Sequence, residues 1–228
     1  MAVNTFKAKE FSMGWSEYHG SSHIGFSALV WAAQLLYVMC FIPQIAENFK
    51  RQSERGLSDF LLIGNMNIYL ALIFDVYCNG YPYPYRITAF LQFFGSVALV
   101  CQSFYYDFSR VRAKKMLLCY GTNLIVALAC IPLAMRYTQA VGEFCAWFLL
   151  LLFSVSFIPQ AFKIYRAKSV QGFSFSFITL FAMANFIEYI LWGLLDLPLP
   201  YMLYTVQNLI MYGVFCVQFF LYAKKDKA

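Results

Sequence analysis

Long apolar stretches separated by short polar segments run through most of the chain. Seven of them reach the roughly 20 residues that a helix needs to cross a ~30 Å hydrocarbon core. They lie near residues 26–47, 57–78, 84–106, 116–135, 141–164, 173–195 and 200–222. Composition agrees, because only 12% of the residues are charged, against about 25% in a soluble domain. The pattern predicts an all-α membrane protein with seven transmembrane helices.

The basic residues are sorted between the two ends of these helices. Thirteen of the 17 lysines and arginines follow the first, third and fifth stretches or lie at the C-terminus. The other four are Lys7, Lys9, Arg86 and Arg136. Because cytoplasmic loops are enriched in Lys and Arg, we expect a cytoplasmic C-terminus and an outer or lumenal N-terminus. A bacterial inner membrane or a lysosomal-type membrane would suit this topology.

An internal repeat relates the two halves of the chain. The sequence FIPQ at residues 41–44 recurs at 157–160, an offset of 116 residues. The same offset aligns Ser53, Gly56 and Ser58 with Ser169, Gly172 and Ser174, and Pro84 and Tyr85 with Pro200 and Tyr201. Residues 26–106 and 141–222 therefore form two three-helix repeats. A single linker helix within 107–140 would return the chain to the side of the membrane where the first repeat begins. The two repeats are therefore predicted to be parallel, in a 3+1+3 arrangement. Residues 1–25 would be a polar arm and 223–228 a basic cytoplasmic tail.

The second copy, FIPQAFKIYRAKSVQGFSFSFITLF, resembles the PQ-loop repeat, with Pro-Gln, basic residues, Lys-Ser, a glycine and a serine in order. The resemblance extends over about residues 26–222. This family includes the lysosomal cystine and cationic amino-acid transporters, the SWEET and SemiSWEET sugar transporters and, more distantly, the KDEL receptor. The resemblance implies the 3+1+3 fold of a transporter.

The repeated Pro-Gln pair is predicted to form a hinge or gate. Pro43 and Pro159 lack a backbone N–H and clash with the preceding turn, so each is expected to kink its helix. Gln44 and Gln160 are expected to bond backbone or neighbouring helices near these breaks. Ser58 and Ser174, which follow the two Pro-Gln pairs at the same spacing, are predicted to cap the next helices.

Polar residues inside the apolar stretches are candidates for a substrate pocket, because a charge in a membrane helix costs about 3 kcal/mol and usually faces a cavity or a partner. The sixth stretch carries Asn185, Glu188, Tyr189 and Trp192 at helical spacing, so we expect them on one face. A network that only joins helices is the alternative. Candidates from the other helices are Asn65, Tyr69, Gln92 and Asn208, and the repeat offset pairs Gln92 with Asn208 across the pseudo-axis.

Glu188 is also the first candidate for proton coupling, because burial disfavours the charged form of a carboxyl group. Asp75 is the second candidate. It is expected near water at the outer end of its helix, where it would face a vestibule.

Three functions remain open at this point. The ends CQSFYYD and VQFFLYAKK resemble the cystine-transporter branch, which favours an amino acid, although that branch's acidic position is Phe181 here. The stretch YILWGLLDLP resembles SemiSWEET, with Tyr189 in place of the sugar-stacking tryptophan, but the asparagines of that pocket are replaced by Ile87 and Leu203. A KDEL-type receptor would bind a peptide in a basic lumenal cavity.

An enzyme is not expected, since the sequence has no nucleophile–base pair or phosphate-binding glycine loop. The seven cysteines show no ligand spacing, so neither a metal nor another cofactor is expected. The expected partners are a small-molecule substrate, protons and the lipid bilayer, without nucleic acid.

Overall fold

The computed structural model describes residues 23–53, 55–106, 109–195 and 199–223. Most of the predicted N-terminal arm and of the basic tail lies outside these ranges. The helices are α2 (His23–Met39), α3 (Phe41–Arg51), α4 (Asp59–Cys78), α5 (Tyr83–Tyr106), α6 (Arg110–Arg136), α7 (Thr138–Ala167), α8 (Phe175–Leu195) and α9 (Leu199–Tyr222).

Seven helical segments are long and apolar enough to cross a membrane, with α2 and α3 counting as one segment, Ser27–Arg51. The prediction of an all-α, seven-helix membrane protein is therefore confirmed. α6 has the least buried of these segments, which indicates that it lies at the edge of the bundle.

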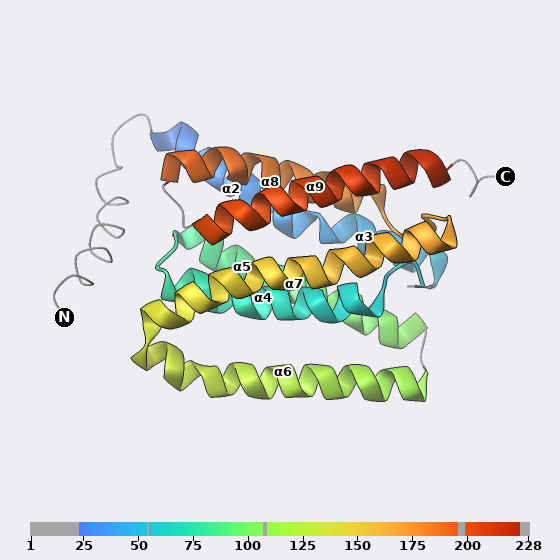
Figure 1. Cartoon of the computed structure of the whole chain (residues 1–228), viewed down its shortest axis with the longest axis horizontal. Coiled ribbons are helices and arrows are strands. Elements are labelled where there is room, and N and C mark those ends of the chain that lie inside the picture. The colour runs from blue at the N-terminus through green and yellow to red at the C-terminus, as the bar shows by residue number, and fades with distance from the viewer. Residues whose placement is uncertain (1–22, 54, 107–108, 196–198, 224–228) are drawn as a thin grey trace.

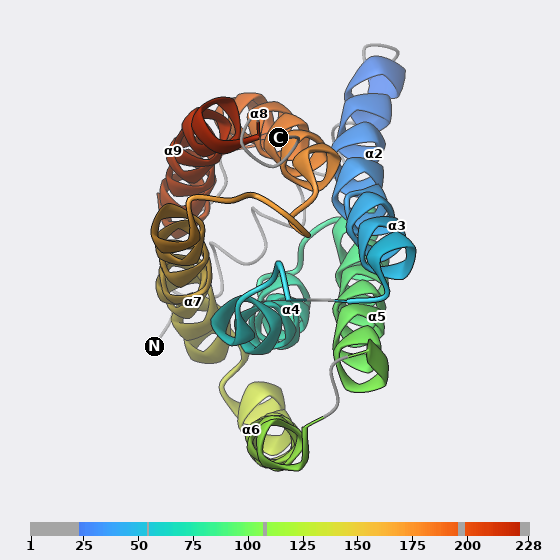
Figure 2. The same ribbon diagram turned by 90° about the vertical axis from the view of Figure 1, so that its right-hand side faces the viewer.

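Six of the segments form a closed ring, in the order α2/α3, α5, α4, α7, α9 and α8 (Figure 2). Within each repeat the third helix lies between the first and the second: α5 contacts α2 and α4, and α9 contacts α7 and α8. The repeats join where the first helix of one packs on the second helix of the other, α2 on α8 and α7 on α4. α6 lies outside the ring against α4 and α7. This is the predicted 3+1+3 arrangement.

The two prolines do not have equal effects on their helices. The first helix is interrupted at Cys40, between α2 and α3, one turn before Pro43. By contrast, α7 is continuous from Thr138 to Ala167 with Pro159 inside it. A proline removes one hydrogen bond but a helix packed along its length tolerates the loss, so the expected pair of equivalent helix breaks is found in one repeat only.

The helix ends divide between two ends of the bundle (Figure 1). α3, α7 and α9 finish at the same end, where the loops to α4 and α8 also lie. We call it the basic end, because it carries Lys50, Arg51, Arg55, Lys163, Arg166 and Lys168. We call residues 52–53 and 55–58 loop one and residues 168–174 loop two.

Candidate functional site

A fully buried carboxyl group lies between the two repeats. Glu188 of α8 is 0% exposed. Its Oε2 accepts hydrogen bonds from the hydroxyl groups of Tyr85 in α5, at 2.9 Å, and Tyr201 in α9, at 3.0 Å. Its Oε1 accepts from Nε2 of Gln34 in α2. Side chains from three other helices of the ring therefore converge on this carboxyl group.

The two tyrosines are related by the repeat, since Tyr85 and Tyr201 are 116 positions apart. A carboxyl oxygen bonded to both must lie close to the pseudo-axis between the halves. The Glu188 site itself is not symmetric, because the repeat places Leu72 opposite Glu188 and Leu150 opposite Gln34. One repeat supplies the acid and the other supplies its amide donor.

The orientation of the Gln34 amide is set by a further contact. Thr88 Oγ1 donates to Gln34 Oε1 at 2.6 Å, and Thr88 is itself 0% exposed. With its oxygen engaged by a donor, Gln34 presents its NH₂ group to Glu188. Every described donor to the carboxyl group is neutral.

A small cavity of about 20 Å³ borders this network. That is room for about one water molecule. Its lining includes Gln34, Tyr69, Tyr85, Gln92, Tyr201 and Tyr204. The centre of the ring is thus occluded, with polar and aromatic groups around a space that would have to expand to hold a metabolite.

The predicted substrate-binding residues do not all lie at the central cavity. Tyr69 and Gln92 line the central cavity, and Asn65 is buried on α4. Asn208 does not meet Gln92: its Nδ2 donates to Asn185 Oδ1 at 3.1 Å, and Asn208 lines a separate small cavity. The expected pairing across the axis is therefore replaced by a bond between α8 and α9 of one repeat.

The four residues expected on one face of α8 are also divided. Asn185 and Glu188 are 0% exposed, whereas Tyr189 is 44% exposed on the outer surface of the bundle. Trp192 is partly buried against the core. The next residue after Glu188 is turned by about 100° around the helix, which carries Tyr189 out of the interior.

Asp75 is more deeply placed than its position near a helix end predicts. It is 0% exposed, and Oδ1 accepts from Asn79 Nδ2 at 2.6 Å. Its Oδ2 has no hydrogen-bond partner among the described residues. Gly142 of α7 makes room for this arrangement, since a Cβ there would lie 2.4 Å from Asn79 Oδ1.

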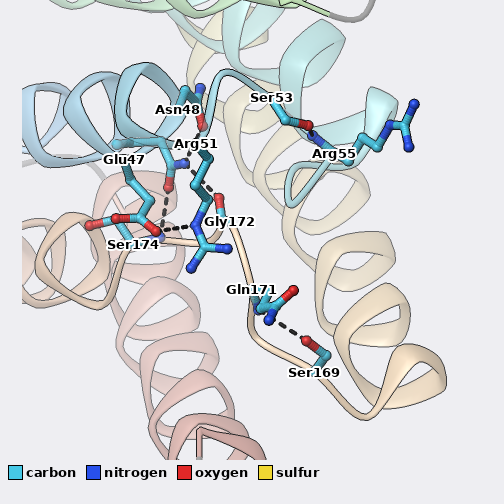
Figure 3. Close-up of polar contacts among 10 residues, drawn as sticks. Glu47, Asn48, Arg51, Ser53, Arg55, Ser169, Gln171, Gly172 and Ser174 are labelled. Atoms are coloured by element: carbon cyan, nitrogen blue, oxygen red, sulfur yellow. Dashed lines mark hydrogen bonds and ion pairs between the residues drawn. The ribbon is translucent and has the colours of Figure 1, made fainter. Parts of the chain in front are cut away.

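The glutamines of the two Pro-Gln pairs each bond to the loop of the other repeat. Gln44 Oε1 accepts from the Ser174 backbone N–H at 2.8 Å, and its Nε2 donates to the Gly172 carbonyl at 2.9 Å. Gln160 makes the equivalent bonds to Ser58, at 2.7 Å, and Gly56, at 2.9 Å. The backbone ties expected of these glutamines are present, and they cross between the halves. Figure 3 shows the half around Gly172 and Ser174.

The two loops meet at their glycines. A Cβ on Gly56 would lie 2.2 Å from the Gly172 carbonyl carbon, and Gly172 has a φ of +77°, which favours glycine. Ser58 and Ser174 cap α4 and α8 as predicted, by accepting from the N–H groups of Leu61 and Phe177. We call Gln44, Gln160 and the two loops the gate.

Several central residues were not recognised from the sequence. Tyr85 and Tyr201 were visible as a matched pair in the repeat, but nothing in their spacing marked them as partners of an acid in another helix. Gln34 and Thr88 are not repeated in the second half, where the corresponding residues are Leu150 and Tyr204. A contact across 154 residues of sequence leaves no local pattern.

A cavity larger than the central one lies away from this site. It has a volume of about 580 Å³ between α4, α6 and α7, outside the ring, and apolar side chains such as Leu70, Phe74 and Phe148 line most of it. Such a lining suits hydrocarbon rather than a polar metabolite. Within the described ranges, no cluster of His, Cys, Asp or Glu side chains is suited to a metal ion.

Comparison with known proteins gives two matches. The profile of the PQ loop repeat family matches residues 25–85 and again residues 141–201, together more than half of the chain. Cystinosin of Drosophila melanogaster is 24% identical over 177 residues. The match covers 66% of this chain and 44% of that protein, so the chain corresponds to less than half of its relative's length.

Proposed function

Because this chain belongs to the PQ-loop repeat family, we propose that it is a multi-pass membrane transporter that carries a small polar metabolite, an amino acid, by alternating access. Similarity to cystinosin and the resemblance of the ends of α5 and α9 to that branch support an amino acid over a sugar. The C-terminus would be cytoplasmic.

The observation that carries the proposal is the buried Glu188 between repeat-related tyrosines. A carboxylate removed from water and paired with neutral groups alone is costly, so it requires a proton or a cationic partner. The ammonium group of an amino acid is such a partner. A sugar offers only hydroxyl groups and would leave the charge uncompensated.

This requirement couples the site to protons. In the occluded, substrate-free form Glu188 would carry a proton. An arriving ammonium group would displace that proton into the solution on the side from which the substrate enters, and a proton would bind Glu188 from the other side when the substrate leaves. Transport would then be linked to a pH gradient. Asp75, which is buried near the end of the ring opposite the basic end, is a second place where a proton could be held.

The gate supports alternating access. The Gln44 and Gln160 bonds close the basic end across the two repeats, and their exchange for bonds to water would allow that end to open. Two similar halves around a central site are the arrangement with which transporters expose that site to each side in turn.

The two alternatives have less support. Tyr189, the residue that would stack on a sugar, is 44% exposed on the outer surface. For a peptide receptor, Arg86 would be expected to face a cavity, but its Nε donates to the Tyr81 carbonyl at 2.7 Å and its guanidinium lies over the Tyr77 ring.

A proteoliposome screen tests the proposal. Purified full-length protein would be offered labelled amino acids and labelled sugars, each with and without an outward proton gradient, acidic inside the vesicle. We expect saturable uptake of one or a few amino acids that the gradient accelerates. Uptake of sugars alone would establish the SWEET-like alternative, and no uptake together with peptide binding would establish a receptor.

A further inference from the structure

One repeat-related position beside the gate carries opposite charges, Lys163 in α7 and Glu47 in α3. Lys163 Nζ donates to the carbonyl oxygens of Arg55 and Leu57, each at 2.5 Å. These carbonyls flank that of Gly56, which Gln160 holds. Three consecutive carbonyl groups of loop one are thus fixed to α7.

Loop two is held differently. Glu47 offers no donor when ionised, and it pairs with Arg51 one turn along α3 (Figure 3). Gln44 holds the carbonyl of Gly172, but the carbonyls of Gln171 and Phe173 receive no side-chain donor from the described residues. Asn48 Oδ1 accepts the second hydrogen of Gln44 Nε2, which orients Gln44 without adding a bond to the loop.

The helix pairs that continue from the two loops also differ in how closely they pack, and the closer packing is again on the side of loop one. α4 and α7 are in close contact at Gly64, where a Cβ would lie 1.8 Å from Ser156 Oγ. The repeat equivalent of Ser156 is Cys40, the residue at which the first helix is interrupted. The continuous α7 therefore lies against α4, and the interrupted α2/α3 segment lies against α8.

We propose that the gate opens on one side: loop two and the start of α8 separate from α3, while α4 stays with α7. Lys163 is the positioning residue that makes the two sides unequal. The proposal rests on the transport function proposed above. Glu188 of α8 bonds to Gln34 of α2, so the interface that moves is the one across which the buried carboxyl group is held.

Hydrogen exchange measured by mass spectrometry on the full-length protein tests the inequality without any substrate. The Ser58 and Ser174 amides are the matched reporters, because each donates to a gate glutamine. We expect peptides covering residues 172–177 to exchange about tenfold faster than those covering 56–61, the factor for roughly one charge-assisted hydrogen bond. Equal exchange in the two loops would overturn the proposal.

Variants of Lys163 and Glu47 show whether these two side chains cause the unequal exchange of the loops. Lys163→Met should accelerate exchange of loop one about tenfold and leave loop two unchanged, and Lys163→Arg should restore protection. Glu47→Lys should slow exchange in loop two, whereas Glu47→Met, which also loses the Arg51 pair but adds no donor, should not. If Lys163→Met accelerated both loops equally, Lys163 would act on overall stability and the assignment would fail.

Uptake provides the second measurement. Glu47→Lys is expected to lower the maximum rate of amino-acid uptake severalfold with little change in KM, because it slows opening without touching the central site. A chain that transports nothing, yet exchanges unequally, would refute the transport function and leave the unequal gate standing. Amino-acid uptake together with equal hydrogen exchange in the two loops would support the transport function and refute the unequal gate.

Discussion

At the scale of single residues, Glu188 is held by three neutral donors and depends on two tyrosines that come from equivalent places in the two repeats. Any rearrangement that moves the repeats apart must break at least one of these bonds. The hydrogen bonds around Glu188 therefore depend both on whether the carboxyl group is ionised and on how the two repeats lie relative to each other.

Glu188→Gln tests the role of this charge. Glutamine keeps the size and one acceptor oxygen but cannot exchange a proton, so we expect uptake to lose its response to a pH gradient and to fall at least tenfold. Uptake of a labelled amino acid would be measured across a series of external pH values.

The control for that variant is Ile190→Val, two residues along α8 and 44% exposed on the outer surface, which should leave the pH profile unchanged. An unaltered pH profile in Glu188→Gln would exclude this carboxyl group as the proton site and transfer the role to Asp75.

At the scale of helices, the two Pro-Gln pairs are alike in sequence but not in structure. Pro43 follows an interruption at Cys40, while Pro159 lies within a continuous helix that packs along α4. The difference arises from packing, since intimate contact on one side compensates for a missing backbone bond.

Substitution of each proline by alanine tests whether these positions are hinges. Both variants should fold, because alanine favours helix, and both are expected to transport more slowly than the unaltered chain. The larger loss is expected for Pro43→Ala, which would favour a continuous first helix. Circular dichroism would verify folding, and initial uptake rates would give the comparison; unchanged rates in both would remove the hinge role.

Much of this architecture could be predicted from the sequence, because helices in a bilayer are specified by apolar length and the repeat by matched letters. The count of segments, the 3+1+3 order and the capping serines follow from such local signals. The partners of Glu188 do not, because they come from three other helices brought together only by the closed ring. The exposure of Tyr189 and the Asn185–Asn208 bond likewise depend on how α8 is rotated in its packing.

At the scale of the whole molecule, the ring joins two parallel repeats through the cross-bonds of the gate and through Glu188. These two sets of bonds lie at different depths of the bundle, and the α2/α3 segment and the α8 side of the ring take part in both, through Gln34 and Gln44 and through Glu188 and Ser174. Opening of the gate therefore changes the environment of the acid, which is the physical link that coupled transport requires.

The side of the membrane that the gate faces depends on the orientation of the molecule in the bilayer. Thirteen of its 17 basic residues belong to the basic end or to the C-terminal segment after α9. Because Lys and Arg near transmembrane helices are retained in the cytoplasm, this asymmetry predicts that the gate faces the cytoplasm and that the buried acid is reached from the opposite side when the gate is closed.

Tags at the two ends of the full-length chain test that orientation. With an odd number of crossings, an epitope at the N-terminus and a green fluorescent protein at the C-terminus must lie on opposite sides of the membrane. We expect the fluorescent protein to be protected from protease added outside intact cells, and the epitope to be accessible to antibody on the outer or lumenal face. An epitope reached only from the cytoplasm would reverse the topology, and the Gln44 and Gln160 bonds would then close the outer side instead.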